Sequence, residues 1–426
     1  MKILIKNGHI VSEYANTDIL MDILCEDGKI SKIDVNIEDE DAEIIDAQGR
    51  HVFPGFIDMH CSMSNPEGAY IESFESLTKA AAKGGFSTVA LLPSTDPPVD
   101  NEAIVDYIVS KGKSYSGIGI YPYGSMTAAC KGEVIANIGQ MVNAGIVALS
   151  DGDRAIDKAQ LLMRIMQYSR MFDICLITHC EDKSLSDGGT VNEGKVSVEL
   201  GLPGVPEEAE SVHAARNILL AECTGAKLHI CHVSTKRTVE LIREAKKRGV
   251  QITAETSPQY FSLTEEEVMG YDTYAKVNPP LRTKKDVHAV AEGICDGTID
   301  VISSGHSPVS GEEKRVEFGN ASFGISSLET AVSAAITELM IKRGRLTPMD
   351  LAKKMSQKPA ELLKIKSKGS VRTGFDADFT IINLNEAFCV DAKGFLSKCR
   401  TTPFSGKFLT GCVVYTIAAG KVIYKR

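Results

Sequence analysis

Three histidines stand directly after short apolar runs of the sequence, and their side chains could together bind a metal ion. They are His60, His179 and His232. Neutral imidazole is the commonest nitrogen ligand of Zn²⁺, and a hydrolytic zinc site combines such ligands with an open position for water. Any one of them alone could simply cap a strand with hydrogen bonds. Three of nine histidines at equivalent positions favour a shared metal site.

The elements that must position these histidines are eight apolar runs, with segments of helical periodicity between them. The runs cover residues 56–59, 88–92, 118–123, 146–149, 174–178, 228–231, 251–254 and 300–303. Eight strand–helix alternations over about 250 residues favour a (β/α)₈ barrel over a doubly wound sheet. Because functional side chains of such barrels lie at the C-terminal ends of the strands, the three histidines are expected at one mouth.

The two ends of the chain have a different pattern. Asn7-Gly8 and Asp27-Gly28 lie between apolar runs, and such pairs are strong signals of hairpin turns. Short strand-like runs recur near the C-terminus. The sequence predicts that residues 1–53 and 366–426 pair into one small β domain, which places both termini together, and that residues 54–365 form the barrel.

Composition and charge exclude several classes of protein. The 426 residues carry 47 Lys and Arg against 56 Asp and Glu, a net charge of −9, which argues against a general nucleic-acid binder or a membrane-surface protein. No apolar run approaches the roughly 20 residues of a membrane helix. Eleven cysteines without a C-x-x-C pair indicate reduced thiols. We therefore expect a cytoplasmic protein with no nucleic-acid or membrane partner.

Several segments together resemble the motifs of dihydroorotases, cyclic amidohydrolases of pyrimidine synthesis. The segments are Pro54 to His60, Ala81 to Val89, His179 to Asp182, Gly201 to Pro206, His229 to Thr235, Val277 to Arg282, Phe323 to Ile325, Leu328 to Thr330 and Thr402 to Phe404. The resemblance covers nearly the whole chain. It implies a barrel with a β-sandwich built from both chain ends. It also implies the reversible cyclisation of N-carbamoyl-L-aspartate to dihydroorotate at two zinc ions.

The metal ligands that the resemblance implies are incomplete. Ser62 replaces the second histidine of the first motif, Gly152 the aspartate that bridges the metals, and Gly305 the aspartate that is both ligand and general base. His60, His179 and His232 remain, and three neutral imidazoles would carry the whole charge of a cation. We therefore expect one zinc ion on these histidines, or none.

Other side chains could replace the missing ligands. Cys61 is expected to point away from the first histidine, because successive side chains of a strand alternate. Asp151 or Asp153 would reach the site only if its loop shifts by one residue. The same alternation predicts that Cys180 and Cys231, which flank the other two histidines, face the barrel wall.

The substrate side departs from the family as well. Ser64 stands where the resemblance implies an arginine that grips the substrate carboxylate, and Ser94 stands where it implies an asparagine, while Asn278 is retained. These three positions are the expected substrate-binding residues.

Three hypotheses follow. The main one is a dihydroorotase homologue with weak or no activity that serves as a structural or regulatory partner of aspartate carbamoyltransferase. The alternative is an active zinc-dependent dihydroorotase, or related cyclic-amide hydrolase, with a reduced metal site. In the third, the barrel mouth binds another small molecule or protein without hydrolysis. The family resemblance also implies a homo-oligomer.

Overall fold

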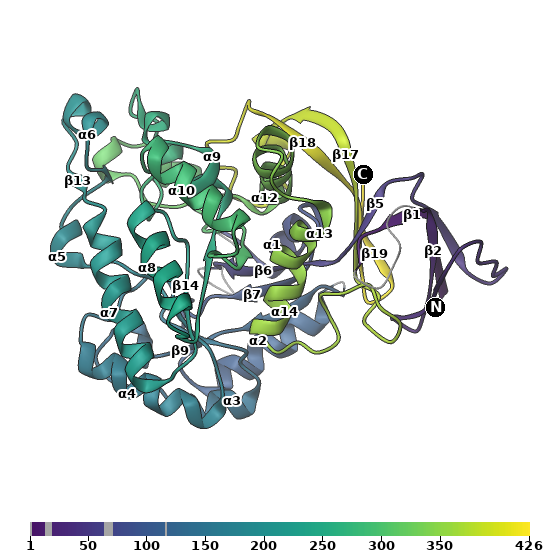
Figure 1. Cartoon of the computed structure of the whole chain (residues 1–426), viewed down its shortest axis with the longest axis horizontal. Helices are drawn as coiled ribbons and strands as arrows, with labels where there is room; N and C mark the ends of the chain where they lie inside the picture. Colours follow the sequence, from purple (N-terminus) through teal and green to yellow (C-terminus); the bar gives the residue numbers. More distant parts are fainter. Residues whose placement is uncertain (1, 13–18, 64–70, 116) are drawn as a thin grey trace.

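A barrel of parallel strands forms the larger part of the protein (Figure 1). The computed structural model describes residues 2–12, 19–63, 71–115 and 117–426. The barrel strands are β6 (Phe56–Cys61), β7 (Phe86–Leu91), β8 (Gly119–Pro122), β9 (Gly124–Ser125), β10 (Leu149–Ser150), β11 (Leu176–Thr178), β14 (Leu228–Ile230), β15 (Ile252–Thr256) and β16 (Val301–Ile302). Strands β8 and β9 are separated by one residue, so they occupy a single strand position. The eight predicted apolar runs all became barrel strands.

Two hydrogen-bonded sheets make up the wall of the barrel. One has the order β6-β7-β8, and the other has the order β16-β15-β14-β11-β10-β9. A parallel bridge between Cys61 and His306 connects the end of β6 to the segment after β16. Buried Asp58 accepts hydrogen bonds from the backbone N–H and the hydroxyl of Ser304 at the same place. These contacts bring the first and the last strand together and close the ring.

Helices surround the barrel, on its outside and near its mouth (Figure 1). They are α1 (Phe74–Lys83), α2 (Glu102–Ser114), α3 (Ile138–Ala144), α4 (Ala159–Ser169), α5 (Lys183–Ser186), α6 (Lys195–Leu200), α7 (Glu208–Thr224), α8 (Lys236–Lys247), α9 (Pro258–Ser262), α10 (Lys284–Cys295), α11 (Gly311–Lys314), α12 (Leu328–Ala335), α13 (Pro348–Ala352) and α14 (Lys358–Leu362). Ser73 and Thr283 begin α1 and α10 with reciprocal capping bonds, which satisfy backbone N–H groups that lack helical partners. π-Helical turns over Ile336–Lys342 and Lys353–Gln357 extend α12 and α13.

Both ends of the chain form one β domain beside the barrel. Its strands are β1 (Lys2–Ile10), β2 (Met21–Glu26), β3 (Lys29–Asp34), β4 (Glu43–Asp46), β5 (His51–Pro54), β17 (Phe379–Cys389), β18 (Phe408–Ala418) and β19 (Lys421–Lys425), in the order β19-β18-β17-β5-β1-β2-β3 with β4 on β1. Strand β5 pairs antiparallel with β17, so the two ends of the chain meet in one sheet. The (β/α)₈ barrel with a small β domain is the predicted fold class; the boundaries at residues 53 and 365 stay a prediction.

One of the two predicted hairpin turns has a different role. Asp27-Gly28 connects β2 to β3 with both residues at positive φ, as expected of a tight turn. Asn7-Gly8 instead lies inside β1, where Asn7 has a φ of 57° and the register with β2 shifts. A left-handed Asn fits a β-bulge as well as a turn, so the dipeptide alone did not distinguish the two.

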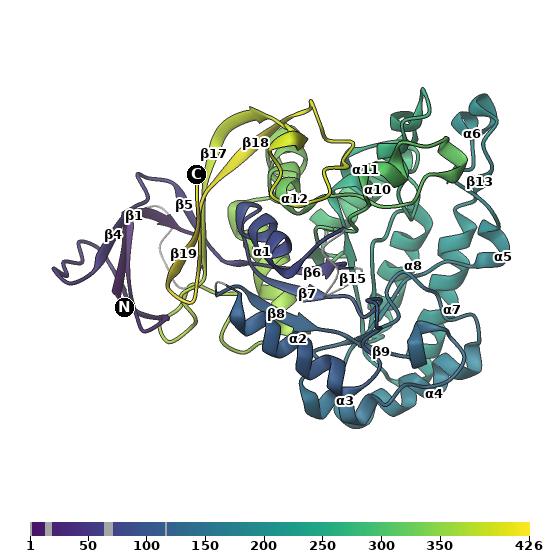
Figure 2. The same cartoon turned by 180° about the vertical axis from the view of Figure 1, so that it is seen from behind.

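The β domain is joined to the barrel by a buried carboxylate. Helices α1 and α12 pack against β18 (Figure 2). At the start of β17, Asp378 accepts hydrogen bonds from Ser87 in β7, at 3.0 Å, and from the backbone N–H of Ala419, at 2.7 Å. The ammonium of Lys368 forms an ion pair with the same carboxylate, and both side chains are buried. In the described part of the chain, no helix is long and apolar enough to cross a membrane.

We expect Lys368→Met to lower the free energy of unfolding by about 3–5 kcal/mol, because it leaves the buried Asp378 carboxylate without its cation. Urea unfolding followed by circular dichroism measures this change. The matched control is Lys79→Met, which breaks an exposed pair with Glu75 and should leave the midpoint nearly unchanged. Equal midpoints for the two variants would contradict the role assigned to the buried pair.

Candidate metal centre

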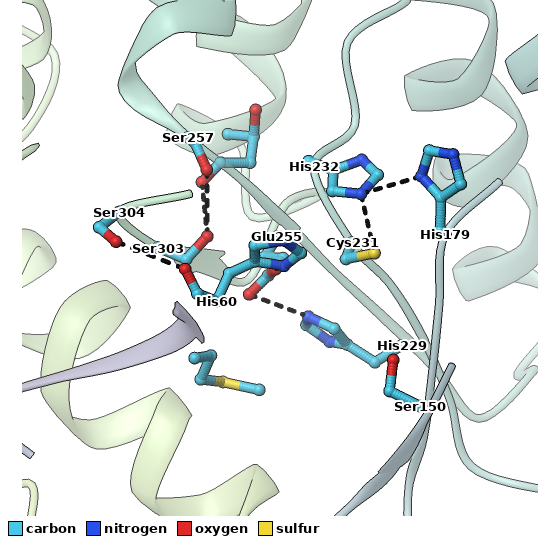
Figure 3. Close-up of polar contacts among 12 residues, drawn as sticks. His60, Ser150, His179, His229, Cys231, His232, Glu255, Ser257, Ser303 and Ser304 are labelled. Carbon is cyan, nitrogen blue, oxygen red and sulfur yellow. Dashed lines mark hydrogen bonds and ion pairs between the residues drawn. The ribbon is translucent and has the colours of Figure 1, made fainter. Parts of the chain in front are cut away.

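The three predicted histidines meet at one end of the barrel (Figure 3). His60 belongs to β6, His179 follows β11 and His232 follows β14. All three side chains are buried. The Nδ1 atom of His179 lies 3.0 Å from Nε2 of His232, and the rings of His60 and His232 have centroids 5.1 Å apart. A tetrahedral zinc with Zn–N bonds of about 2.0–2.1 Å holds two nitrogens about 3.3 Å apart. The closest pair therefore has nearly the spacing that one ion requires.

A buried carboxylate on β15 orients the first histidine. Glu255 Oε1 lies 2.9 Å from Nδ1 of His60, which leaves Nε2 of that ring for the cavity. On its other side Oε2 is 3.5 Å from Nε2 of His229. Burial opposes ionisation of Glu255, but the adjacent imidazoles of His229 and His60 outweigh it and lower its pKa to about 2. Carboxylates in this position fix the tautomer and orientation of a metal-binding imidazole.

A second carboxylate does the same for His179. Glu181 Oε2 lies 2.9 Å from Nε2 of His179, so Nδ1 faces His232. The hydroxyl of Ser186 and the amide of Asn278 donate hydrogen bonds to this carboxylate, at 2.7 and 3.3 Å. Two of the three rings are therefore held in place by carboxylates that lie behind them.

The loop after β10 brings one aspartate to the site. Asp153 Oδ1 lies 3.6 Å from Nε2 of His60, and its side chain is 44% exposed at the edge of the cavity. Asp151 is turned away, because it accepts hydrogen bonds from the backbone N–H groups of Met126 and Thr127, at 2.8 and 3.0 Å. Burial raises the pKa of Asp151 to about 6 despite these bonds. Of the two candidates for the missing carboxylate, Asp153 is the one that reaches the histidines.

Side chains already fill the space beside Gly152 and Gly305, the two positions where the family resemblance implies acidic residues. A Cβ on Gly152, which has a φ of 65°, would lie 2.5 Å from Ser94 Oγ. A Cβ on Gly305, with a φ of 64°, would lie 2.5 Å from Ser257 Oγ and 3.0 Å from Gln259 Nε2. Ser94, an expected substrate-binding residue, thus packs against Gly152. At both positions the neighbouring side chains leave no space for a residue larger than glycine.

The remaining candidates from the sequence analysis are Cys61, Ser62, Ser64 and Asn278. Cys61 is buried in the hydrophobic core, as strand alternation predicts, and Ser62 donates its backbone N–H to the carbonyl of His306. Ser64, the third expected substrate-binding position, lies outside the described residues. Asn278 lines the cavity together with His60.

The expectation for Cys231 was wrong. Its Sγ lies 3.2 Å from Nε2 of His232 instead of facing only the barrel wall (Figure 3). Ligand atoms of His60, Cys231 and His232 all lie within 4.8 Å of one another. Strand β14 ends at Ile230, and His232 has a φ of 38°, so the alternation of a regular strand does not extend through this segment. Cys180 differs, with its Sγ 3.7 Å from the amide nitrogen of Asn217.

The site opens into a cavity of about 110 Å³. Its lining includes His60, Asp153, His232, Gln259, Asn278 and Gly305. Gln259 is buried, and its Oε1 atom has no hydrogen-bond partner among the described residues. The sequence reasoning missed both Gln259 and Glu255. Glu255 could have been found, because an acidic residue at the end of an apolar barrel strand is costly unless it has a partner.

Comparison with known proteins finds relatives along the whole chain. The family description Dihydro-orotase-like matches residues 49–238. The sequence is 48% identical to a dihydroorotase of Acetivibrio thermocellus, over 99% of both chains. It is 46% identical to a dihydroorotase of Ruminiclostridium cellulolyticum, over 100% of this chain and 99% of the relative. An L-hydantoinase (dihydropyrimidinase) from Arthrobacter aurescens has the same fold, with a TM-score of 0.88, 27% identity and coverage of 99% and 96%.

We expect Gly305→Asp to lower the free energy of unfolding by about 2 kcal/mol or more, because it adds both backbone strain and a clash with Ser257. The control is Gly344→Asp, at a φ of 61° with nothing within 4 Å of the added Cβ, which adds the strain alone. Adding Ser257→Gly to Gly305→Asp should recover part of the loss. Denaturant unfolding of the four proteins compares them, and equal losses for the two single aspartate variants would show that the space is not filled.

Proposed function

The chain belongs to the dihydroorotase family, and we propose that it catalyses the reversible cyclisation of N-carbamoyl-L-aspartate to dihydroorotate slowly, with one metal ion. The relatives that share its full length favour a working enzyme with a reduced site over an inactive chain. One observation carries the proposal: Asp153 lies 3.6 Å from His60 and supplies a carboxylate where Gly152 has none.

The donor set fits one divalent cation. His179 Nδ1 and His232 Nε2 lie 3.0 Å apart, the ligand atoms of His60 and His232 lie within 4.8 Å of each other, and Asp153 Oδ1 lies 3.6 Å from His60. A divalent ion bound there would polarise the carbonyl of the cyclic amide and lower the pKa of a water molecule. A second ion would need the acidic residues that Gly152 and Gly305 replace. The proposal is therefore for one ion per chain, and zinc is the metal that imidazole ligands suit best in hydrolysis.

The chain's own side chains supply orientation. Glu255 and Glu181 hold the rings of His60 and His179 from behind, so that Nε2 of His60 is left for the cavity and Nδ1 of His179 faces His232. Asn278 borders the cavity and donates to Glu181. The unpartnered Oε1 atom of Gln259 can accept a hydrogen bond from an N–H group of the substrate. This arrangement positions a small polar ring beside the three histidines.

A missing proton acceptor explains why the reaction is proposed to be slow. The family's general base is an aspartate at the position of Gly305, and the surroundings of that glycine leave no room for one. A positioned general base typically contributes about 10²–10⁴-fold to a rate. We propose that turnover is lower than that of a complete site by a factor of this size.

We expect the protein purified without chelator to contain close to one metal ion per chain and to interconvert carbamoyl-aspartate and dihydroorotate at high enzyme concentration. His179→Ala should remove both properties, because it deletes one nitrogen of the closest pair. The control is His288→Ala, which truncates an exposed histidine on α10. Metal analysis and an absorbance assay of dihydroorotate measure the two properties. Metal-free wild-type protein without conversion would contradict the proposal.

A second candidate function is that of a structural or regulatory partner of aspartate carbamoyltransferase. The filled spaces beside Gly152 and Gly305 favour it, since they indicate a scaffold adapted to the loss of both acids. We expect co-elution with an aspartate carbamoyltransferase from the same cell in size-exclusion chromatography, and His179→Ala should co-elute unchanged because a docking role does not use the barrel mouth. Separate elution of the wild-type chain argues against this role. The cytoplasmic location and the homo-oligomer stay predictions.

A further inference from the structure

We propose that Cys231 is a ligand of the same ion and binds it as a thiolate, so that the site selects a borderline or soft divalent cation such as Zn²⁺, Co²⁺ or Cd²⁺ over Mg²⁺ or Ca²⁺. This inference rests on the proposed one-ion site and names an additional ligand for it. Thiolates prefer such cations, whereas Mg²⁺ and Ca²⁺ prefer oxygen ligands.

The position of the sulfur atom supports the assignment. Cys231 Sγ lies 3.2 Å from Nε2 of His232, the nitrogen that also lies 3.0 Å from His179. A tetrahedral zinc with a Zn–S bond of about 2.3 Å and Zn–N bonds of about 2.0–2.1 Å separates sulfur and nitrogen by about 3.5 Å. The ligand atoms of His60, Cys231 and His232 all lie within 4.8 Å of one another, so two histidine nitrogens and this sulfur form a group that can hold one ion.

The charge of the site provides an independent argument. The carboxylates of Glu255 and Glu181 lie behind the rings and act on an ion only through the imidazoles, and Asp153 is 44% exposed at the edge of the cavity. Cys231 is buried, so its thiolate would place one negative charge in direct contact with the ion, where charge compensation matters most.

The backbone explains why a cysteine that precedes a ligand can itself reach the ion. In a regular strand two consecutive side chains point to opposite faces. Strand β14 ends one residue earlier, at Ile230, and His232 has a left-handed backbone with a φ of 38°. The turn at this point lets Cys231 and His232 approach the same point.

Cys180 supplies a matched control. It stands next to His179 in the sequence as Cys231 stands next to His232, and both thiols are buried. Its Sγ lies 3.8 Å from the hydroxyl of Thr178 and 3.7 Å from the amide of Asn217. Replacing Cys180 removes a similar buried thiol beside the site without removing the proposed ligand.

The test is to load wild-type protein, Cys231→Ser and Cys180→Ser with Co²⁺ and to record near-ultraviolet absorption and the dissociation constant. We expect a thiolate-to-cobalt charge-transfer band in the wild type and in Cys180→Ser, and no band in Cys231→Ser. Loss of an outer hydrogen-bond partner of a metal ligand costs roughly 10–100-fold in affinity. Loss of a direct ligand should cost at least as much, so Co²⁺ should bind Cys231→Ser at least about tenfold more weakly.

The outcomes separate this inference from the proposed function. A wild-type chain that binds one Co²⁺ without the charge-transfer band overturns the sulfur ligand and leaves the one-ion site standing. A band that persists in Cys231→Ser also overturns it. A wild-type chain that binds no Co²⁺ contradicts both. Thermal unfolding of the metal-free variants shows whether each is folded, and zinc X-ray absorption of the wild type provides a second reading, with a sulfur shell at about 2.3 Å expected.

Discussion

A divalent cation inside a protein needs negative charge close by, because its own hydration is lost and neutral ligands only partly compensate. The features of this barrel mouth follow from that constraint. Neither Gly152 nor Gly305 supplies an acid, yet three histidines meet at the site, and the nitrogens of His179 and His232 have nearly the spacing of two ligands of one ion. Asp153, from the same loop as Gly152, and Cys231, beside His232, bring a carboxylate and a thiol into contact distance of the histidines from the side of the mouth. Asp153 follows a left-handed glycine, and Cys231 lies beyond the end of β14, so neither residue is part of a regular strand.

Gly152 and Gly305 are each surrounded by residues that fit a glycine. Gly152 has a left-handed φ, and this turn sends Asp151 into backbone hydrogen bonds and Asp153 toward His60. Ser94 occupies the space that a side chain on Gly152 would need, as Ser257 does beside Gly305. The glycines and the serines packed against them therefore fit one another. An aspartate placed at either position alone would meet a clash before it could serve as a ligand.

The sequence predicted the barrel well, because eight apolar runs with helical segments between them have few other three-dimensional solutions. It also predicted that the three histidines meet, since strand ends of a barrel share one mouth. It could not predict which of two neighbouring aspartates faces the site, because one left-handed glycine decides this. The prediction for Cys231 failed for a similar reason, as strand alternation ends at Ile230. Such local backbone conformations depend on tertiary contacts, so they cannot be predicted from the residue types alone.

The carboxylates behind the rings keep two histidines oriented without an acidic residue at position 152 or 305. Glu255 holds His60, and Glu181 holds His179, by contacts of 2.9 Å that need no metal ion. Glu255 also contacts His229 deeper in the barrel, so the orientation of the first ring depends on buried side chains rather than on the mouth. The orientation of these two rings is thus set by residues behind them and not by the residues at positions 152 and 305. The arrangement is therefore compatible both with slow catalysis and with a purely structural role.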